Sequence, residues 1–460
     1  MYIAVLRIIA GYIFYKESFV DKLTVHPLSY SDDLINQYQT LSHLPGFILL
    51  ESSDKQRGRY DIVTAMPYDE FKIMSDSSDI NEAFSRFQRM LPKTHSSLDF
   101  PFQGGAMGYM AYDFGAVLAG IRSPVHPLLQ DIPLIDMRFY DWAIIADHKK
   151  KQVHLIAAHQ QPETAALIKE ILGYWERKPL VYQPFKLQQT FRPVISKLDY
   201  QQSFQAIHQA LTQGRAYQVN YTQPFIGQYS GDSWDVYKRI RRSNPVPFAV
   251  FLRGADFEIL SFSPERFLSM DNALVQASPI KGTSIRSNDP KIDEHLRASL
   301  VLSAKDRAEN VMIVDLLRND LGKIAKPGSV RVTALCEVMS FSAVHHLVSN
   351  IEAICIDGLT PTQVFAACFP GGSITGAPKR EAMYIISEQE RFGRGVYCGS
   401  IGYFSSHGRF DSNIAIRTIT ATKNALYMAA GGGIVIDSTW EDEYKECYTK
   451  IEAILSIINT

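Results

Sequence analysis

The lysine at position 281 has apolar and glycine flanks, which favour partial removal of its amine from bulk water. It stands between Ile280 and Gly282-Thr283, after a β-type run from Phe257 to Phe262. Glycine lets a ligand or another backbone approach closely, and desolvation lowers the pKa of an amine and makes it nucleophilic. Alternatively, a lysine at the end of a strand extends its side chain back to water. This stretch alone leaves both interpretations open.

A carboxylate follows the same β-type run. Glu265 comes directly after Ser263-Pro264, at the expected end of a strand. A carboxyl group in a poorly solvated cleft has a raised pKa and can donate a proton near neutral pH. The alternative is an ordinary ion pair with the next residue, Arg266.

Two predicted helices carry acidic residues at helical spacing. The helix expected from Ala304 to Gly322 has Asp306 and Glu309 three residues apart, so both point from one face. A second helix, from Trp440 to Ile458, carries charged residues on one stripe: Glu443, Glu446 and Lys450. Such acids usually mark only a solvated face, but here they stand beside apolar residues. A divalent cation held by oxygen ligands is the functional alternative.

A glycine-rich loop, Phe369 to Lys379, runs into a predicted helix with Pro378 in its first turn. Free backbone N–H groups at a helix start favour an anion. Ala377 occupies the position of a phosphate-loop lysine, so nucleotide binding is not expected. A carboxylate or another polar ligand edge fits better, with Ser373 and Thr375 offering hydroxyls and Gly376 allowing close approach. Arg417 lies in an apolar strand, where it needs a partner such as a carboxylate.

The elements expected to position these residues are mixed strands and helices along the whole chain. Ser31-Asp32-Asp33 predicts the start of a helix through Leu41, and Gly46 to Leu50 reads as a buried strand. The polar segment from Glu176 to Ser196 is the best linker candidate.

Composition limits the partners and the compartment. A net charge of −1 with no basic block argues against nucleic acid. Five scattered cysteines predict reduced thiols and a cytoplasmic protein. Residues 1–22 are apolar but interrupted by Arg7 and Lys16, so we expect an extension of unknown role and no membrane span.

Six motifs in a fixed order resemble the chorismate-utilising enzymes, a family that includes anthranilate, isochorismate, salicylate and aminodeoxychorismate synthases. The resemblance is tight from Leu198 onward and looser before it. The lysine at position 281 resembles the residue that component I of aminodeoxychorismate synthases has at this position, whereas anthranilate synthases typically have alanine there. The motifs are Ser263-Pro264-Glu265, Pro279-Ile280-Lys281-Gly282-Thr283, Ala308-Glu309-Asn310, Ile313 to Asp320, Phe369 to Lys379 and Gly431 to Val435.

The resemblance implies a reaction and a metal. Lys281 would attack C2 of chorismate while Glu265 protonates the leaving C4 hydroxyl, and ammonia would then add at C4. Mg²⁺ would be held directly by Glu309 and Glu446, with Asp306 and Glu443 acting through water. The expected substrate-binding residues are Thr283, His346, Ser373, Thr375, Gly376, Tyr403, Arg417, Gly431, Gly432, Gly433 and Lys450. Among them, Tyr403 and Arg417 would bind the enolpyruvyl carboxylate. The neighbouring His345 is open to a simple core role.

Two further stretches, around Leu50 to Ser52 and around Pro247-Phe248, resemble the walls of the tryptophan pocket in anthranilate synthases. A tryptophan-sized pocket, regulatory or structural, is therefore one hypothesis; plain core strands and turns are the alternative. The pocket residues would be Leu50, Glu51, Ser52, Arg59, Tyr60, Asp61, Pro247 and Phe248.

The resemblance implies an α+β fold of two stacked subdomains, each with a large antiparallel sheet and flanking helices. Residues 23–180 and 190–460 would form one unit. No Gly-x-Cys-x-Gly elbow of a glutaminase is present, so a glutamine amidotransferase subunit would supply ammonia in a heterodimer. The expected product is 4-amino-4-deoxychorismate, for para-aminobenzoate and folate synthesis. Anthranilate synthase component I and a non-catalytic tryptophan- or metabolite-binding module remain as alternatives.

Overall fold

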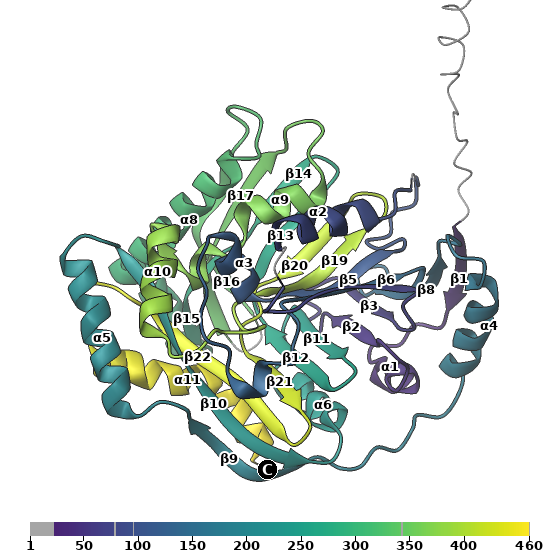
Figure 1. Cartoon of the computed structure of the whole chain (residues 1–460), viewed down its shortest axis with the longest axis horizontal. Helices are drawn as coiled ribbons and strands as arrows, with labels where there is room; N and C mark the ends of the chain where they lie inside the picture. Colours follow the sequence, from purple (N-terminus) through teal and green to yellow (C-terminus); the bar gives the residue numbers. More distant parts are fainter. Residues whose placement is uncertain (1–22, 78–79, 95, 342–343, 460) are drawn as a thin grey trace, which may run out of the picture.

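The computed structural model describes residues 23–77, 80–94, 96–341 and 344–459 (Figure 1). The expectation for residues 1–22 lies outside this part of the chain. Two large antiparallel sheets organise the described residues, one of twelve strands and one of ten. The predicted α+β class with two large antiparallel sheets and flanking helices is therefore confirmed.

The first sheet combines strands from both ends of the chain. Its spatial order is β1 (Thr24–Leu28), β8 (Gln152–Ala157), β7 (Trp142–Asp147), β3 (Tyr60–Thr64), β2 (Ile48–Glu51), β11 (Phe248–Arg253), β12 (Phe257–Ser263), β21 (Thr418–Thr422), β22 (Ala425–Ile434), β10 (Gln218–Ser230) and β18 (Gly376–Ala377), with β9 (Lys186–Pro193) also paired to β10.

The second sheet also combines strands from the N-terminal and C-terminal regions, so neither region forms a sheet by itself. Its order is β15 (Ile280–Ile285), β17 (Val344–Ile354), β14 (Leu274–Ala277), β13 (Arg266–Asp271), β20 (Phe410–Asn413), β19 (Ser400–Ser405), β5 (Gly105–Met110), β6 (Ile135–Tyr140) and β4 (Asp69–Ile73), with β16 (Arg331–Ser340) paired to β17.

Helices flank the sheets (Figure 1). Helix α8 packs on β15, β16 and β17, whereas α11 packs on β22 and α10 on β10. The α-helices are α1 (Ile35–Leu41), α2 (Ile80–Met90), α3 (Tyr112–Leu118), α4 (Thr164–Trp175), α5 (Lys197–Thr212), α6 (Ser233–Ser243), α7 (Pro290–Leu302), α8 (Ala304–Gly322), α9 (Pro361–Cys368), α10 (Lys379–Gln389) and α11 (Trp440–Ile458). Within the described ranges, none is both long and apolar enough to cross a membrane.

Local signals set the helix boundaries. Helices α8 and α11 have the predicted bounds, and each begins after a hydroxyl residue that accepts a backbone N–H: Ser303 before α8 and Thr439 before α11. Helix α1 begins later than Ser31-Asp32-Asp33 indicated, at Ile35. The Asp33 carboxylate still accepts the Ile35 N–H at 3.1 Å, so the cap lies two residues before the helix.

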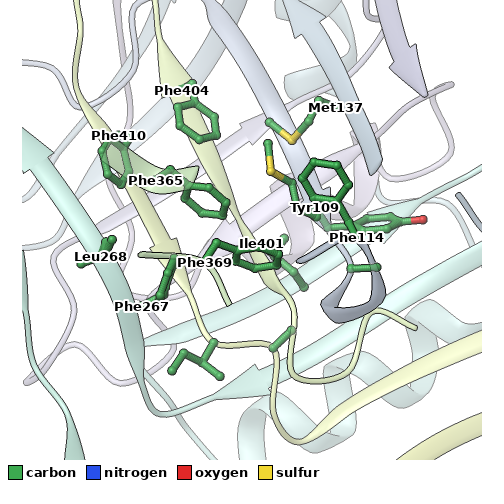
Figure 2. Packing of buried hydrophobic residues seen from close by; sticks show 14 of the residues in the cluster. Tyr109, Phe114, Met137, Phe267, Leu268, Phe365, Phe369, Ile401, Phe404 and Phe410 are labelled. Atoms are coloured by element: carbon green, nitrogen blue, oxygen red, sulfur yellow. The ribbon is translucent and has the colours of Figure 1, made fainter. Parts of the chain in front are cut away.

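An aromatic cluster fastens the second sheet to α9 and to the loop that follows it. Figure 2 shows Phe365 close to Phe369, Phe404 and Phe410. The Phe365 ring stacks on Phe369 at 5.1 Å and meets Phe404 edge-on at 5.6 Å. Phe267 of β13 contacts both Phe365 and Phe369. Because these rings are buried, the first residues of the glycine-rich loop are held against β13 and β19.

Candidate active site

Glu265 lies where the chain passes from one sheet to the other, between β12 and β13. Its side chain is buried, and the Ser373 hydroxyl donates to its Oε1 at 2.9 Å. Burial raises the pKa of Glu265 to about 7, although the charge of Lys281 and the Ser373 hydrogen bond oppose the rise. The neighbouring Arg266 is paired with Asp411 at 2.9 Å, so it does not neutralise Glu265. Glu265 can therefore donate a proton near neutral pH.

Lys281 lies in a distorted part of β15, close enough to Glu265 for its charge to lower the pKa of that carboxyl. The pairing with β17 slips between Ile280 and Thr283, as at a β-bulge. Gly282 within this bulge has φ +82°, and a Cβ there would lie 3.1 Å from Asp306 of α8. The bulge thus brings a half-buried amine beside the acid and the start of α8 beside the amine.

His346 of β17 lies opposite Thr283 of β15, two residues after Lys281. Its Nδ1 lies 2.9 Å from the Thr283 hydroxyl. Burial, with the positive charges of Arg57 and Arg417, lowers the pKa of His346 to about 4, so the ring is neutral at pH 7. His345 points elsewhere: its ring contacts Ser340 and Asp293, a saturated structural role. The alternation of a β-strand separates the two histidines.

The glycine-rich loop supplies one polar group to the site and uses the others to hold itself. Ser373 reaches Glu265, as described. The Thr375 hydroxyl instead donates to the carbonyls of Gly371 and Gly372, and its side chain is fully buried. Gly376 pairs with Val219 in β18, where a Cβ would lie 2.1 Å from the Gln218 carbonyl. Thr375 and Gly376 therefore shape the loop that presents Ser373.

Two cations hold the loop in place: Arg394, from outside it, and Lys379, its last residue. The Arg394 guanidinium, almost fully buried, donates to the Ile374 carbonyl at 2.7 Å, to the Asn220 carbonyl at 2.6 Å and to Glu390. Lys379 donates to the Cys368 carbonyl at 2.7 Å and pairs with Asp320. The loop next to Glu265 is therefore rigidly anchored on both sides of Ser373.

The first turns of α11 place two carboxylates against β22. A Cβ at Gly432 would lie 2.4 Å from Glu443 Oε2 and 3.1 Å from Glu446 Oε1. Glu443 is buried, and burial followed by the Glu446 charge raises its pKa to about 7. Ser438 donates to Glu443 Oε1 at 2.8 Å, while Oε2 has no hydrogen-bond partner in the described chain. An unpaired buried carboxylate oxygen beside a second carboxylate suits a cation.

The acids of α8 face the same region. Asp306 lies against Gly282, and the charge of Lys305 at the start of α8 acts on Glu443. Glu309 is half-buried one turn further along. No group of three or more His, Cys, Asp or Glu side chains in the described ranges has metal-binding geometry. If these acids held Mg²⁺, water and substrate would therefore have to supply most of its shell, which is how Mg²⁺ is usually bound.

Arg417 and the glycines of β22 provide cationic and N–H groups for an anion. Arg417 has φ +51°, and its guanidinium makes no hydrogen bond or ion pair with the part of the chain that the structure describes. Burial lowers its pKa. Gly431 to Gly433 of β22 pair with β10 on one side. On the other side, the pairing of β22 with β21 ends at Met428, so β21 does not pair with these glycines. Lys450 donates to the Gly431 carbonyl at 2.8 Å and pairs with Glu446 at 2.6 Å.

Tyr403 is not placed with these groups. It lies in the wall of a cavity between β2, β11 and β19, which we call the second cavity to distinguish it from the candidate active site, and its ring contacts Phe102. The expectation that it joins Arg417 at the enolpyruvyl carboxylate therefore finds no support in the geometry. Tyr403 lies in β19 of the second sheet, opposite Asp411. Arg417 lies in the segment that leads from that sheet to β21 of the first sheet.

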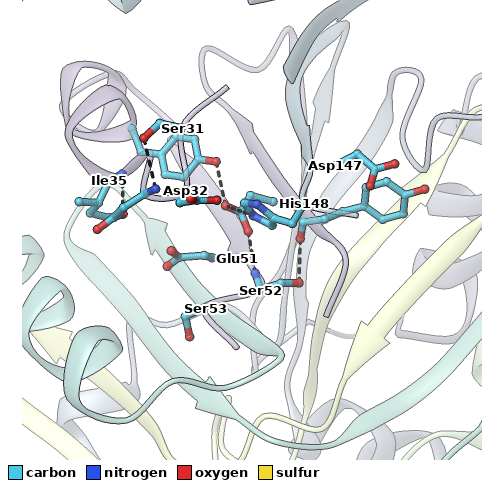
Figure 3. Close-up of polar contacts among 12 residues, drawn as sticks. Ser31, Asp32, Ile35, Glu51, Ser52, Ser53, Asp147 and His148 are labelled. Atoms are coloured by element: carbon cyan, nitrogen blue, oxygen red, sulfur yellow. Dashed lines mark hydrogen bonds and ion pairs between the residues drawn. The ribbon is translucent and has the colours of Figure 1, made fainter. Parts of the chain in front are cut away.

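The second cavity has a volume of about 280 Å³. The predicted pocket residues line it with the exception of Asp61, which lies behind the wall: Leu50, Glu51, Ser52, Arg59, Tyr60, Pro247 and Phe248. Figure 3 shows Glu51, Ser52 and His148 in this corner. The Asp61 carboxylate accepts the Ser52 N–H at 2.8 Å and contacts the ring of His148. Burial raises the pKa of Glu51 to about 7 despite its ion pair with Arg241.

The sequence did not predict two cations, Arg394 and Arg57, that the fold brings near the candidate active site. Arg394 was not expected because its contacts, Ile374 and Asn220, are remote in sequence and are backbone carbonyls. Arg57 lies in the polar turn after β2 and acts on His346, which is far along the chain. Its position next to the predicted pocket motif was the only available signal.

Comparisons with known proteins identify the family of this chain. The family model described as chorismate binding enzyme matches residues 46–456. Aminodeoxychorismate synthase component 1 from Salmonella typhimurium is 41% identical over 453 residues, which cover 94% of this chain and 97% of the relative. Anthranilate synthase component 1 from Acetivibrio thermocellus is 34% identical over 380 residues, covering 78% of this chain and 75% of the relative.

A solved structure shows the same architecture. Anthranilate synthase component I from Streptococcus pneumoniae TIGR4 has a TM-score of 0.78 and 29% identity, covering 86% of this chain and 92% of that chain. The resemblance predicted from the ordered motifs is confirmed. The chain belongs to the family of chorismate binding enzymes.

Proposed function

We propose that the chain aminates chorismate at C4 to give 4-amino-4-deoxychorismate, a precursor of para-aminobenzoate. The observation that carries the proposal is the proximity of an amine, Lys281, to a buried carboxyl, Glu265, whose pKa is raised to about 7. A name shared by relatives supports the same reaction, since the Salmonella typhimurium relative is an aminodeoxychorismate synthase component 1.

The proposed reaction has two displacements. The neutral Lys281 amine forms a bond to C2, the two ring double bonds shift, and the C4–O bond breaks while Glu265 donates a proton to the departing water. The proton lost by the new lysine–carbon linkage restores Glu265. Ammonia then bonds to C4, the double bonds shift back, and the C2–Lys281 bond breaks while a proton from the new C4 ammonium passes to the leaving Lys281 nitrogen. The sum is chorismate plus ammonia to aminodeoxychorismate plus water, with the enolpyruvyl group intact.

The remaining residues orient and solvate the substrate. Arg417 and the open edge of Gly431 to Gly433 would hold a carboxylate, and Ser373 keeps the Glu265 carboxyl directed at the leaving group. Glu309 and Glu446 would hold Mg²⁺, with Asp306 and Glu443 supporting them. When bound, Mg²⁺ would screen the acids and bind the ring carboxylate.

Mass spectrometry of the product tests the proposal directly. Purified chain, chorismate, Mg²⁺ and excess ammonium should give an amine that retains the enolpyruvyl group. Without ammonium, the intact protein should gain the mass of chorismate less one water, and Lys281→Ala should lose both signals. Lys291→Ala, an exposed lysine of α7, serves as the control. Anthranilate plus pyruvate would instead assign the chain to the alternative reaction, and an unmodified but active protein would exclude the covalent step.

We further propose that a glutamine amidotransferase subunit supplies the ammonia in the cytoplasm. The relatives are named component 1, which supports a second component, and five unpaired buried cysteines are consistent with a reducing compartment. Glutamine should support turnover only after that subunit is added, whereas ammonium should support turnover without it. Turnover of glutamine by the purified chain alone would contradict this division.

The second cavity is a candidate tryptophan site. Its supporting observation is that two remote segments, Leu50 to Ser52 and Pro247-Phe248, line one volume with aromatic and charged walls. Calorimetry with tryptophan should show binding that is weakened by Ser52→Phe. Absence of heat and of any thermal shift would leave the cavity as a packing feature.

A further inference from the structure

We infer that Arg57 is a second cationic anchor for the substrate, binding one of its carboxylates opposite Arg417. This inference rests on the proposed function, because it assumes that a dicarboxylate occupies the site beside Lys281. Arg57 belongs to the polar turn between β2 and β3, which no motif in the sequence connects with catalysis.

The Arg57 guanidinium is fixed but incompletely used. Its Nε donates to Asp54 Oδ2 at 2.7 Å, and its Nη2 donates to the Pro245 carbonyl at 3.4 Å. Its plane lies over the Phe341 ring at 4.6 Å. The third nitrogen, Nη1, is buried and has no hydrogen-bond partner in the described chain. A buried donor without a partner carries a desolvation cost that a ligand acceptor would remove.

The neighbours of Arg57 connect it with the active site. Phe341, under the guanidinium, also contacts the His346 ring at 5.8 Å. The charge of Arg57 lowers the pKa of both His346 and Arg417. Asp54 neutralises one face of Arg57, but Arg417 has no ion-pair partner among the described residues. Arg57 and Arg417, both half-buried, therefore place two positive charges near the neutral His346 ring, where a bound anion would offset them.

The chemistry of that anion follows from the donors. A guanidinium presents a planar fork that matches a carboxylate, and a pair of them about one ring suits a small dicarboxylate. Chorismate has this character. Since Arg57 also lines the second cavity, the competing assignment is that Nη1 serves an occupant of that cavity.

Arg57→Gln separates these possibilities. Loss of one charge-assisted hydrogen bond should raise the KM for chorismate roughly 10- to 100-fold, while kcat changes less than about threefold. Arg57→Lys keeps the charge but loses the fork, so its KM should rise less. Lys55→Gln removes an exposed charge from the same turn and should leave KM within about twofold.

Three outcomes overturn the inference. One is a KM in Arg57→Gln within twofold of the native value. Another is loss of tryptophan affinity with unchanged KM, which assigns Nη1 to the second cavity. If Arg57→Gln does not fold, an unchanged KM in Arg57→Lys overturns it as well. Calorimetry with chorismate alone keeps the inference separate from the reaction: native binding without turnover would reject only the proposed function, and equal binding by Arg57→Gln would reject the anchor.

Discussion

Glu265→Gln should stabilise the protein at alkaline pH while removing its activity. In the folded chain, burial raises the pKa of Glu265 from 4.5 to about 7. The protonated form is therefore favoured by folding, and its contribution to stability is complete below pH 4.5 and is lost as pH rises through 7. The shift corresponds to about 3 kcal/mol between these limits. Glutamine is neutral at every pH and does not incur this loss.

The side chain replaced is nearly isosteric, and the environment accepts the amide. The Ser373 hydroxyl can donate to the amide oxygen as it does to Oε1. Near pH 5 the variant and the native chain should therefore have similar stability. At pH 8 the variant should gain about 3 kcal/mol, which is roughly 3 °C in melting temperature for a chain of this length.

Thermal unfolding of both chains from pH 4.5 to 8.5, without substrate or Mg²⁺, measures the difference. Glu170→Gln, at an exposed position of α4, controls for loss of a negative charge and should show a flat difference. Turnover of chorismate by Glu265→Gln should fall by about 10²- to 10⁴-fold, the usual contribution of a general acid. A pH-independent difference in melting temperature would refute the raised pKa, and retained turnover would refute the role of Glu265 as acid.

Two further predictions concern the supports of the site. Arg394→Lys should keep the charge near Glu390 but lose the simultaneous hydrogen bonds to the Ile374 and Asn220 carbonyls. We therefore expect kcat to fall about tenfold with little change in KM. Steady-state kinetics and the melting temperature would be measured together, and a change in melting temperature without a change in kcat would reject the positioning role. Glu443→Gln removes a carboxylate whose Oε2 has no partner, so the Mg²⁺ concentration for half-maximal activity should rise at least tenfold, and Mg²⁺ calorimetry should show the same weakening. Equal Mg²⁺ affinity would exclude Glu443 from the metal site.

The sequence predicted best where local chemistry determines structure. Helix α8 has a hydroxyl cap at Ser303 and ends at Gly322, so its bounds required no tertiary information. The glycine-rich loop was predicted to present hydroxyls and an anion-binding helix start. Thr375 instead bonds within the loop, because strand pairing between Gly376 and Val219 fixes its path. That contact joins segments far apart in the chain, and no local pattern encodes it.

Residue roles were hardest to predict where side chains from different sheets share one wall. The family resemblance placed Tyr403 at the substrate site, but in the structure Tyr403 pairs with Asp411 and lines the second cavity. Arg57 stands beside the cavity motif, but its contact with Phe341 directs its charge to His346. Sequence neighbours alone would therefore place Tyr403 at the substrate site and would connect Arg57 only with the cavity that it lines.

The passage of the chain between the two sheets explains why a carboxyl group and an amine meet here. Glu265 occupies the single turn that joins β12 of the first sheet to β13 of the second. Such a crossing buries the side chain under both sheets, which raises its pKa, and places it beside the edge strand β15, where a bulge can present an amine. The same topology that desolvates the acid therefore positions Lys281, and a change that moved β13 relative to β15 would alter both protonation and reach.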